Sequence, residues 1–126
     1  GLDPKERIRI LNLISEVAKD KIVIIATHVV TDVEFIAKEI VMLSNGKIIR
    51  SGSPSKLLKE LDGKVWNIFL SDNEIDEVNT GYKVSNISRD ADGVIARIIA
   101  DSYDGRWQKE AVRPNLEDLY LYLNGD

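Results

Sequence analysis

The stretch IVIIATHVV at residues 22–30 constrains the fold most, because it holds five consecutive apolar residues followed by Thr27 and His28. A run of Ile and Val without polar alternation is typical of a strand buried on both faces, as in parallel sheets. His28 is the only histidine in the 126 residues. Ligands bind beyond the carboxyl ends of strands in open α/β sheets, so the position suits a ligand-facing imidazole. A buried histidine that is bonded to a backbone carbonyl is the alternative that position alone leaves open.

Local signals predict further elements in residues 1–61. Asp3-Pro4 predicts the start of a helix, with Asp3 as its N-cap and a wide apolar face along its length. Thr31 and Glu34 have the spacing of a capping box, which predicts a short helix at 32–38. Asn45-Gly46 lies between two apolar runs and predicts a β-hairpin, because both turn positions need positive φ. Ser53-Pro54 predicts a helix through Leu61.

The second half differs from the first in charge and in pattern. Residues 1–61 carry 10 Lys and Arg against 8 Asp and Glu, whereas residues 62–126 carry 7 against 13. Such a shift near Asp62-Gly63 predicts two regions, 1–61 and 62–126. The second region reads as α+β, with strands at 65–70, 82–89, 94–101 and 105–112, a short helix at 72–78, and a helix capped by Asn115.

Composition excludes several classes of function. The chain has no cysteine, so it has neither disulfides nor thiolate chemistry. The acidic second half argues against a nucleic-acid surface, which needs clustered Lys and Arg. A small hydrolase that uses His28 lacks a convincing nucleophile, since there is no cysteine and no G-x-S-x-G elbow.

The order of motifs resembles a known family. GLDP at residues 1–4, a helix, an apolar segment ending in Thr27-His28, a second helix, the VMLSNGKIIRSG hairpin at 41–52 and a Ser53-Pro54 helix resemble the C-terminal part of an ABC-transporter ATP-binding domain. In that family GLDP is the D-loop and Thr-His is the H-loop. The tail RPNLEDLYLYLNG at 113–125 resembles the closing segment of exporter ATPases of the bacitracin and daunorubicin resistance type, which carry a small α+β extension.

The resemblance implies a fold class: an α/β chain that forms the C-terminal part of a P-loop NTPase domain at 1–61, followed by an α+β accessory domain at 62–126. The sequence contains no G-x-x-x-x-G-K-[ST] loop, LSGGQ signature, Q-loop or Walker B acids. We expect these upstream of Gly1, in a longer parent protein. By this expectation the parent binds ATP and Mg²⁺, and the fragment alone binds neither cofactor and does not hydrolyse ATP.

The same resemblance implies roles for single residues. His28 would contact the γ-phosphate and help to position the attacking water. Gly1, Leu2 and Asp3 would lie at the interface between two ATPase subunits, and Thr27 would support the backbone turn. No metal ligand is expected in the fragment.

Other candidate residues have simpler explanations. Glu117 and Asp118 form a carboxylate pair, but acids in the first turn of a helix favour its positive dipole end. Aromatic residues in the extension are expected to pack rather than to bind ligand; they are Trp66, Trp107, Tyr120 and Tyr122.

The family resemblance also implies partners and a cellular location. A second ATP-binding subunit and membrane-spanning permease subunits would bind the parent, which would lie in the cytoplasm at the inner face of the membrane. Without its neighbouring strands the fragment would expose apolar faces and self-associate. The alternative function is a stand-alone regulatory or dimerisation module, in which residues 62–126 recognise a partner.

Overall fold

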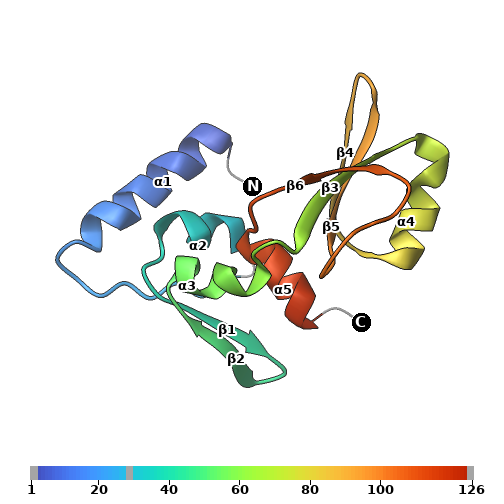
Figure 1. Cartoon of the computed structure of the whole chain (residues 1–126). Helices are drawn as coiled ribbons and strands as arrows, with labels where there is room; N and C mark the ends of the chain where they lie inside the picture. Colours follow the sequence, from blue (N-terminus) through green and yellow to red (C-terminus); the bar gives the residue numbers. More distant parts are fainter. Residues whose placement is uncertain (1–2, 28–29, 125–126) are drawn as a thin grey trace.

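The computed structural model describes residues 3–27 and 30–124, and it combines helices with two antiparallel sheets (Figure 1). The helices are α1 Pro4–Val17, α2 Val30–Ile36, α3 Pro54–Leu58, α4 Ile75–Gly81 and α5 Leu116–Asn124, with 3-10 turns at Lys59–Leu61 and Asp72–Glu74. The strands are β1 Ile40–Ser44, β2 Lys47–Gly52, β3 Val65–Leu70, β4 Lys83–Asp90, β5 Gly93–Ile99 and β6 Gln108–Ala111. The predicted elements are present within a few residues of their expected bounds, with the exception of the strand at 21–26.

The buried strand predicted at residues 21–26 is wrong. Residues 22–27 form neither strand nor helix, and Ile22 and Ile24 are 93% and 90% exposed. A strand needs a neighbour for its backbone hydrogen bonds, and the strand pairings in the described part of the chain are antiparallel and involve other segments. The expected parallel α/β arrangement is therefore replaced, over the described residues, by helices with antiparallel sheets.

The wide apolar face of α1 is present and exposed, as predicted for a fragment that lacks its neighbouring strands. None of the described side chains of α1 is buried, and Ile8 and Leu13 are 55% and 63% exposed. Figure 1 shows α1 at the outer edge of the molecule, where it packs on α2. The helix pattern thus has the right period, but the described chain supplies too few partners to cover it.

The β1–β2 hairpin forms as the Asn-Gly pair predicts. Asn45 and Gly46 adopt φ of 53° and 76°, the left-handed values that such a turn requires. Met42 of β1 points into the core, while its neighbours Val41 and Leu43 are exposed. One face of the hairpin is therefore apolar and open.

The second sheet has the strand order β4-β5-β3-β6, and its pairings are antiparallel. Ile68 of β3 pairs with Ala96 of β5, and both are fully buried against Val78 of α4. Strand alternation accounts for this core, because every second side chain of β5 faces the same side.

A further core cluster joins the two halves of the chain. It contains residues from both sides of position 62: Met42, Leu57, Leu61, Val65, Ile99, Leu116 and Leu119. Helix α5 packs against α2, α3 and β4, so the last helix touches segments of the first half (Figure 1). The division at residue 62 stays a prediction, and the two proposed regions share a core.

Candidate functional site

The structure places only some of the predicted site residues. Asp3 caps α1 as predicted, and its exposed carboxylate accepts the Glu6 N–H at 2.8 Å. Gly1, Leu2 and His28 lie outside the described residues. Thr27 is exposed and directly precedes the undescribed pair. The interface, catalytic and turn-supporting roles of these residues therefore stay predictions.

The predicted capping box of the second helix is wrong. Helix α2 begins at Val30, so Thr31 lies inside the helix instead of capping it. The Glu34 carboxylate instead accepts a hydrogen bond from the first residue of α5.

The two segments that carry the GLDP and Thr-His motifs meet in space. Arg7 Nε in the first turns of α1 lies 3.4 Å from Asp32 Oδ1 near the start of α2. Arg7 is four residues after Asp3, and Asp32 is five residues after Thr27. The fold thus brings the N-terminal parts of both helices together.

Large apolar side chains are exposed in the first half of the described chain. The most exposed of them come from α1, the extended segment and the β-hairpin; they are Ile8, Leu13, Ile22, Ile24, Val41, Leu43 and Ile48, each more than half exposed. Large exposed apolar patches mark interaction surfaces in proteins, so these residues are candidates for such a surface.

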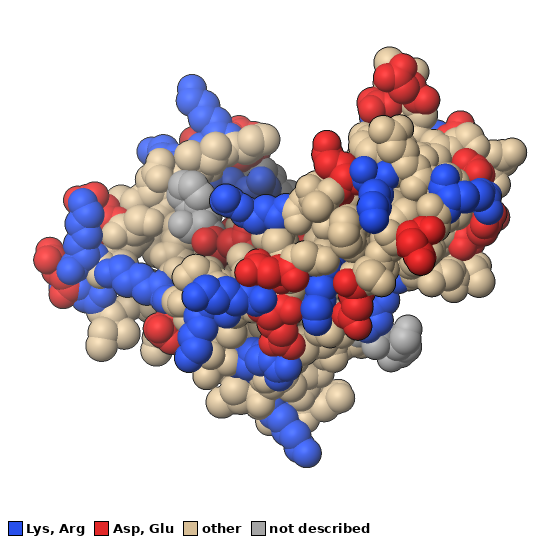
Figure 2. Space-filling model, in the orientation of Figure 1, with Lys and Arg blue, Asp and Glu red and all other residues tan. Residues whose placement is uncertain are grey.

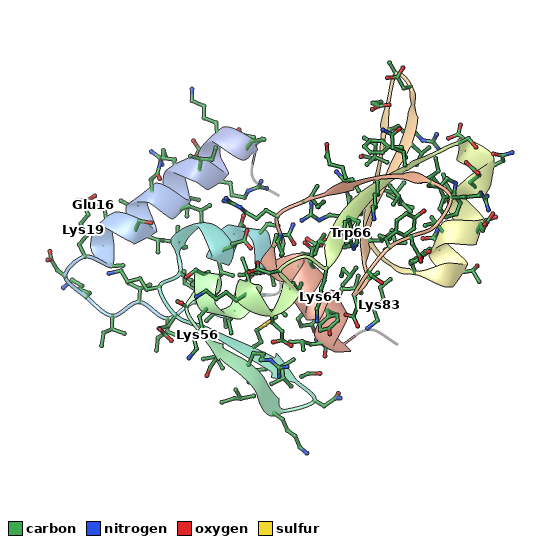
Figure 3. The ribbon with its side chains drawn as sticks, in the orientation of Figure 1. Glu16, Lys19, Lys56, Lys64, Trp66 and Lys83 are labelled. Atoms are coloured by element: carbon green, nitrogen blue, oxygen red, sulfur yellow. The ribbon has the colours of Figure 1, made fainter. Side chains whose placement is uncertain are left out.

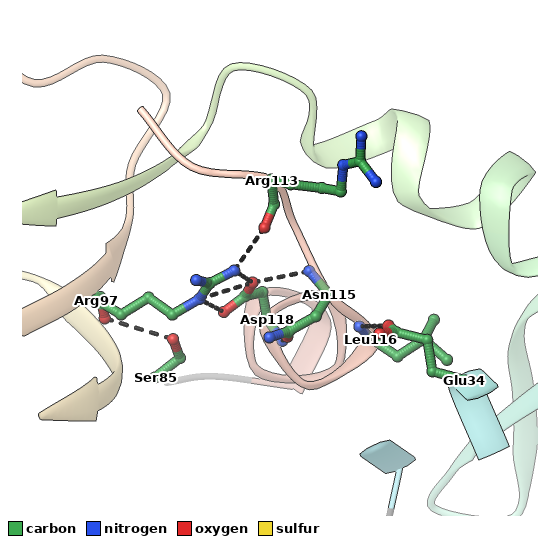
Figure 4. Close-up of polar contacts among 7 residues, drawn as sticks. All are labelled: Glu34, Ser85, Arg97, Arg113, Asn115, Leu116 and Asp118. Atoms are coloured by element: carbon green, nitrogen blue, oxygen red, sulfur yellow. Dashed lines mark hydrogen bonds and ion pairs between the residues drawn. The ribbon is translucent and has the colours of Figure 1, made fainter. Parts of the chain in front are cut away.

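Asp118 is the buried charged residue of the described core, and an arginine neutralises it (Figure 4). Its carboxylate accepts hydrogen bonds from Arg97 Nε at 3.0 and 3.1 Å and from Arg97 Nη2 at 2.7 Å. Arg97 Nη2 also donates to the Arg113 carbonyl at 2.6 Å. A buried carboxylate needs such a partner, because burying an unpaired charge is very unfavourable.

The same aspartate closes the N-terminus of α5. Asp118 Oδ2 accepts the Asn115 N–H at 2.9 Å, and Asn115 Oδ1 accepts the Asp118 N–H at 2.8 Å. This reciprocal pair confirms Asn115 as the cap and satisfies two backbone donors. The sequence predicts that Asp118 lies in the first turn of this helix, but it does not predict the pairing of Asp118 with Arg97. A signal existed in β5, where Arg97 interrupts the apolar strand VIARII.

Glu34 supplies the remaining cap from a different helix. Its Oε1 accepts the Leu116 N–H at 2.6 Å, across 82 positions of sequence (Figure 4). Leu116 is the first residue of α5 and is almost fully buried. A carboxylate at this point satisfies an otherwise unpaired N–H and faces the positive end of the helix dipole.

Lysines occupy the opposite end of α5 (Figure 3). Lys83 Nζ donates to the Tyr122 carbonyl at 3.1 Å. Lys64 and Lys83 also lie 5.5 and 5.7 Å from the centre of the Tyr122 ring. Cations at the C-terminal end favour the negative end of the dipole, so charges hold both ends of this helix.

The aromatic residues of the extension follow the packing prediction, with one exception. Trp66 is partly buried, and its Nε1 donates to the Ala100 carbonyl at 3.1 Å. Trp107 packs against the core cluster that contains Ile68 and Val78. Tyr122 packs against the cluster that joins the two halves of the chain. Tyr120 is 44% exposed, so the prediction that it packs is wrong.

A second charged cluster ties α4 to the loop before β6. Arg106 donates to Glu77 at 2.6 and 2.8 Å and to Glu74 at 3.0 Å. The backbone N–H of Ser71 donates to Glu74 at 2.9 Å. The Ser71 hydrogen bond, assisted by Arg106, lowers the pKa of Glu74 to about 2. These groups satisfy one another at the surface, so the cluster has a structural explanation.

Two open hollows lie on the surface of the described chain. One, of about 680 Å³, lies beside Asp72, Asp90 and Asp92, near the acidic tip of the β4–β5 hairpin in Figure 2. The other, of about 390 Å³, lies between Glu34 and Lys59. Among residues 3–27 and 30–124, no group of three or more His, Cys, Asp and Glu could hold a metal ion. Over the same ranges, no helix is long and apolar enough to cross a membrane.

Comparison with known proteins gives consistent relatives for about half of the chain. The chain is 35% identical over 57 residues to ABC transporter A family member 8 of Dictyostelium discoideum, covering 45% of this chain and 7% of that protein. It is 36% identical over 74 residues to human ATP-binding cassette sub-family A member 9, covering 59% of this chain and 4% of that protein.

A bacterial relative is also similar. The energy-coupling factor transporter ATP-binding protein EcfA2 of Mycoplasmoides gallisepticum is 43% identical over 58 residues, covering 45% of this chain and 18% of that protein. No protein-family model matches the chain. The chain therefore spans only a small part of the length of these relatives.

Proposed function

About half of this chain is related in sequence to ATP-binding proteins of ABC transporters, and we propose that the chain is the C-terminal portion of such a subunit. Residues 1–61 would complete the ATP-binding domain, and residues 62–126 would form its accessory extension. The observation that carries the proposal is the sequence relationship together with the order GLDP, Thr-His, hairpin and final helix.

The exposed apolar side chains support this proposal. The run at residues 22–26 has the composition of a central parallel strand, yet Ile22 and Ile24 are open to solvent. In the whole subunit, upstream strands would pair with this run and cover the apolar face of α1. The sequence contains no G-x-x-x-x-G-K-[ST] phosphate loop, so we expect that this part of the subunit does not bind ATP and Mg²⁺ alone. Those parts would come from the rest of the subunit.

Residue roles follow from the family resemblance. His28 would contact the terminal phosphate of ATP and orient water. Asp3, with Gly1 and Leu2, would face a second ATP-binding subunit, and Thr27 would support the turn before His28. The contact between Arg7 and Asp32 is compatible with both roles, because it holds the two motif-bearing segments together.

Partners and transport direction belong to the same proposal. We expect a second ATP-binding subunit and membrane-spanning permease subunits as partners. These would place the protein in the cytoplasm at the membrane surface. The tail RPNLEDLYLYLNG supports an exporter.

The coding DNA upstream of the Gly1 codon provides the first test. A continuous reading frame that encodes a P-loop, a signature segment and a Walker B strand is expected. A stop codon or a start codon close to Gly1 would contradict the proposal. In that case a stand-alone interaction module would be the better explanation.

Substitution of His28 tests the catalytic role. In the full subunit, His28→Ala should abolish most ATP turnover and leave ATP binding unchanged, since the imidazole acts on the terminal phosphate. Thr31→Ala, an exposed change in α2, is the matched control and should keep turnover. Normal turnover in His28→Ala would refute the assigned role.

A further inference from the structure

The smaller of the two hollows lies where the two halves of the chain meet. Ser55, Leu58 and Lys59 line it from the helical segment 54–61, and Arg113 and Pro114 line it from the segment that leads into α5. Its volume of about 390 Å³ lies within the range of small-molecule sites, which is about 300–1,000 Å³. A ligand in this hollow would therefore contact both halves at once.

Arg113 differs from the other arginines of the described chain. Each of the others lies within ion-pair distance of an Asp or Glu carboxylate; they are Arg7, Arg9, Arg50, Arg89, Arg97 and Arg106. The Arg113 carbonyl accepts a hydrogen bond from Arg97, but its guanidinium has no partner among the residues that the structure describes. Figure 4 shows this guanidinium extending away from the Asp118 carboxylate. It is therefore available to an anion from outside the chain.

Two further donors face the same hollow. Ser55 and Lys59 are four residues apart in one helical segment, so their side chains lie on the same side of it. The Lys59 ammonium has no ion-pair partner in the described chain, and the Ser55 hydroxyl lies 3.5 Å from Ser53 Oγ, at the limit of a hydrogen bond. A guanidinium, an ammonium and a hydroxyl together form a donor set that suits a phosphate group.

Two carboxylates also line the hollow, and they differ in their contacts. Glu34 Oε1 accepts the Leu116 N–H at 2.6 Å, so Glu34 already has a structural partner. The Asp62 carboxylate has no ion-pair or side-chain hydrogen-bond partner among the described residues. Two unpaired cations therefore face one unpaired carboxylate, which leaves the hollow attractive to an anion and makes Asp62 unfavourable for its binding.

We propose that this hollow binds the phosphate group of a small phosphorylated molecule, with Arg113 and Lys59 as its cationic partners and Ser55 as a further donor. A phosphate monoester carries nearly two negative charges at neutral pH, which two cations balance. Leu58 and Pro114 supply an apolar wall for the organic part of such a molecule. Because Lys59 and Arg113 come from different halves, the ligand would strengthen the contact between them. The inference does not depend on the proposed function.

The first measurement is a titration of the present chain with inorganic phosphate and with glycerol phosphate, at constant ionic strength in chloride. Backbone amide NMR signals of Ser55, Lys59 and Arg113 should shift and saturate, and glycerol phosphate should bind more tightly because it also contacts the apolar wall. Equal or tighter binding of inorganic phosphate would overturn the assignment of an organic ligand. Absence of saturable shifts with both compounds would overturn the site itself.

Variants test the donors one at a time. Arg113→Ala and Lys59→Ala should each weaken the binding of glycerol phosphate about tenfold, as expected for the loss of one charge-assisted hydrogen bond. Arg113→Ala keeps the carbonyl that Arg97 contacts, so it should fold normally. Lys56→Ala is the matched control, since Lys56 is an exposed lysine of the same helix that does not line the hollow. It should leave the affinity unchanged.

Asp62→Asn provides a change of the opposite sign. Removal of this unpaired negative charge should tighten the binding of glycerol phosphate about fivefold. A damaged fold cannot produce tighter binding, so this result would support the site independently of the other variants. Unchanged affinity in Arg113→Ala and Lys59→Ala, or an equal loss in Lys56→Ala, would overturn the inference.

Discussion

Removing the Asp118 carboxylate should destabilise the chain strongly. In Asp118→Ala, the acceptor of three Arg97 contacts at 2.7–3.1 Å and of the Asn115 N–H at 2.9 Å is lost. The Arg97 side chain is only 20% exposed, so water replaces its partner poorly. Breaking a buried ion pair costs about 3–5 kcal/mol.

Because Arg97 reaches solvent in part, we expect a loss near the lower end, about 3 kcal/mol. For a chain of this size such a loss lowers the melting temperature by roughly 10 °C. Urea denaturation followed by circular dichroism measures the free energy of unfolding directly. Glu117→Ala, in the same helical turn but exposed, should stay within about 0.5 kcal/mol of the unchanged protein. A loss below about 1 kcal/mol in Asp118→Ala would refute the reasoning, because it would mean that the pair is neither buried nor needed.

Three further predictions concern other parts of the chain. Replacing Ile22 and Ile24 by Ser should reduce self-association, measured by light scattering, and should leave the melting temperature nearly unchanged, since both side chains are exposed. The pKa of Glu74 is lowered to about 2, so its contribution to stability is complete above its unfolded value near 4.5 and is lost as pH falls toward 2. Glu74→Gln should flatten this acid-side loss in pH-dependent unfolding, and an unchanged pH profile would contradict the assignment. Gly46→Val should destabilise the hairpin by about 1 kcal/mol or more, because a β-branched residue is strained at φ 76°.

Local chemistry made much of the fold predictable. Asn45 and Gly46 specify the turn because both residues tolerate positive φ. Asp3 and Pro4 specify a helix start, because the Asp3 side chain caps a free backbone N–H and the proline ring fixes φ near its helical value. Both signals act within a few residues, so they operate regardless of what surrounds them. The run at 22–26 is different, because an apolar segment becomes a strand only when another strand accepts its hydrogen bonds.

The candidate site was less predictable for a related reason. Glu34 has capping-box spacing with Thr31, yet its carboxylate caps a helix 82 positions away. Asp118 likewise has the sequence pattern of an ordinary acid in a first helical turn, yet it is buried and pairs with Arg97, 21 positions earlier. Tertiary pairing of this kind leaves only a weak trace in the sequence, such as a single arginine in an apolar strand.

The shared core has a consequence for synthesis of the protein. Met42, Leu57 and Leu61 emerge from the ribosome well before Leu116 and Leu119, with which they pack. Apolar core residues of the first half therefore stay exposed until α5 has been synthesised. During that interval the nascent chain is a natural target for chaperones and a hazard for aggregation. A ribosome stalled before residue 116 should hold a chain that proteases cleave readily within residues 40–61, and release past residue 119 should protect it.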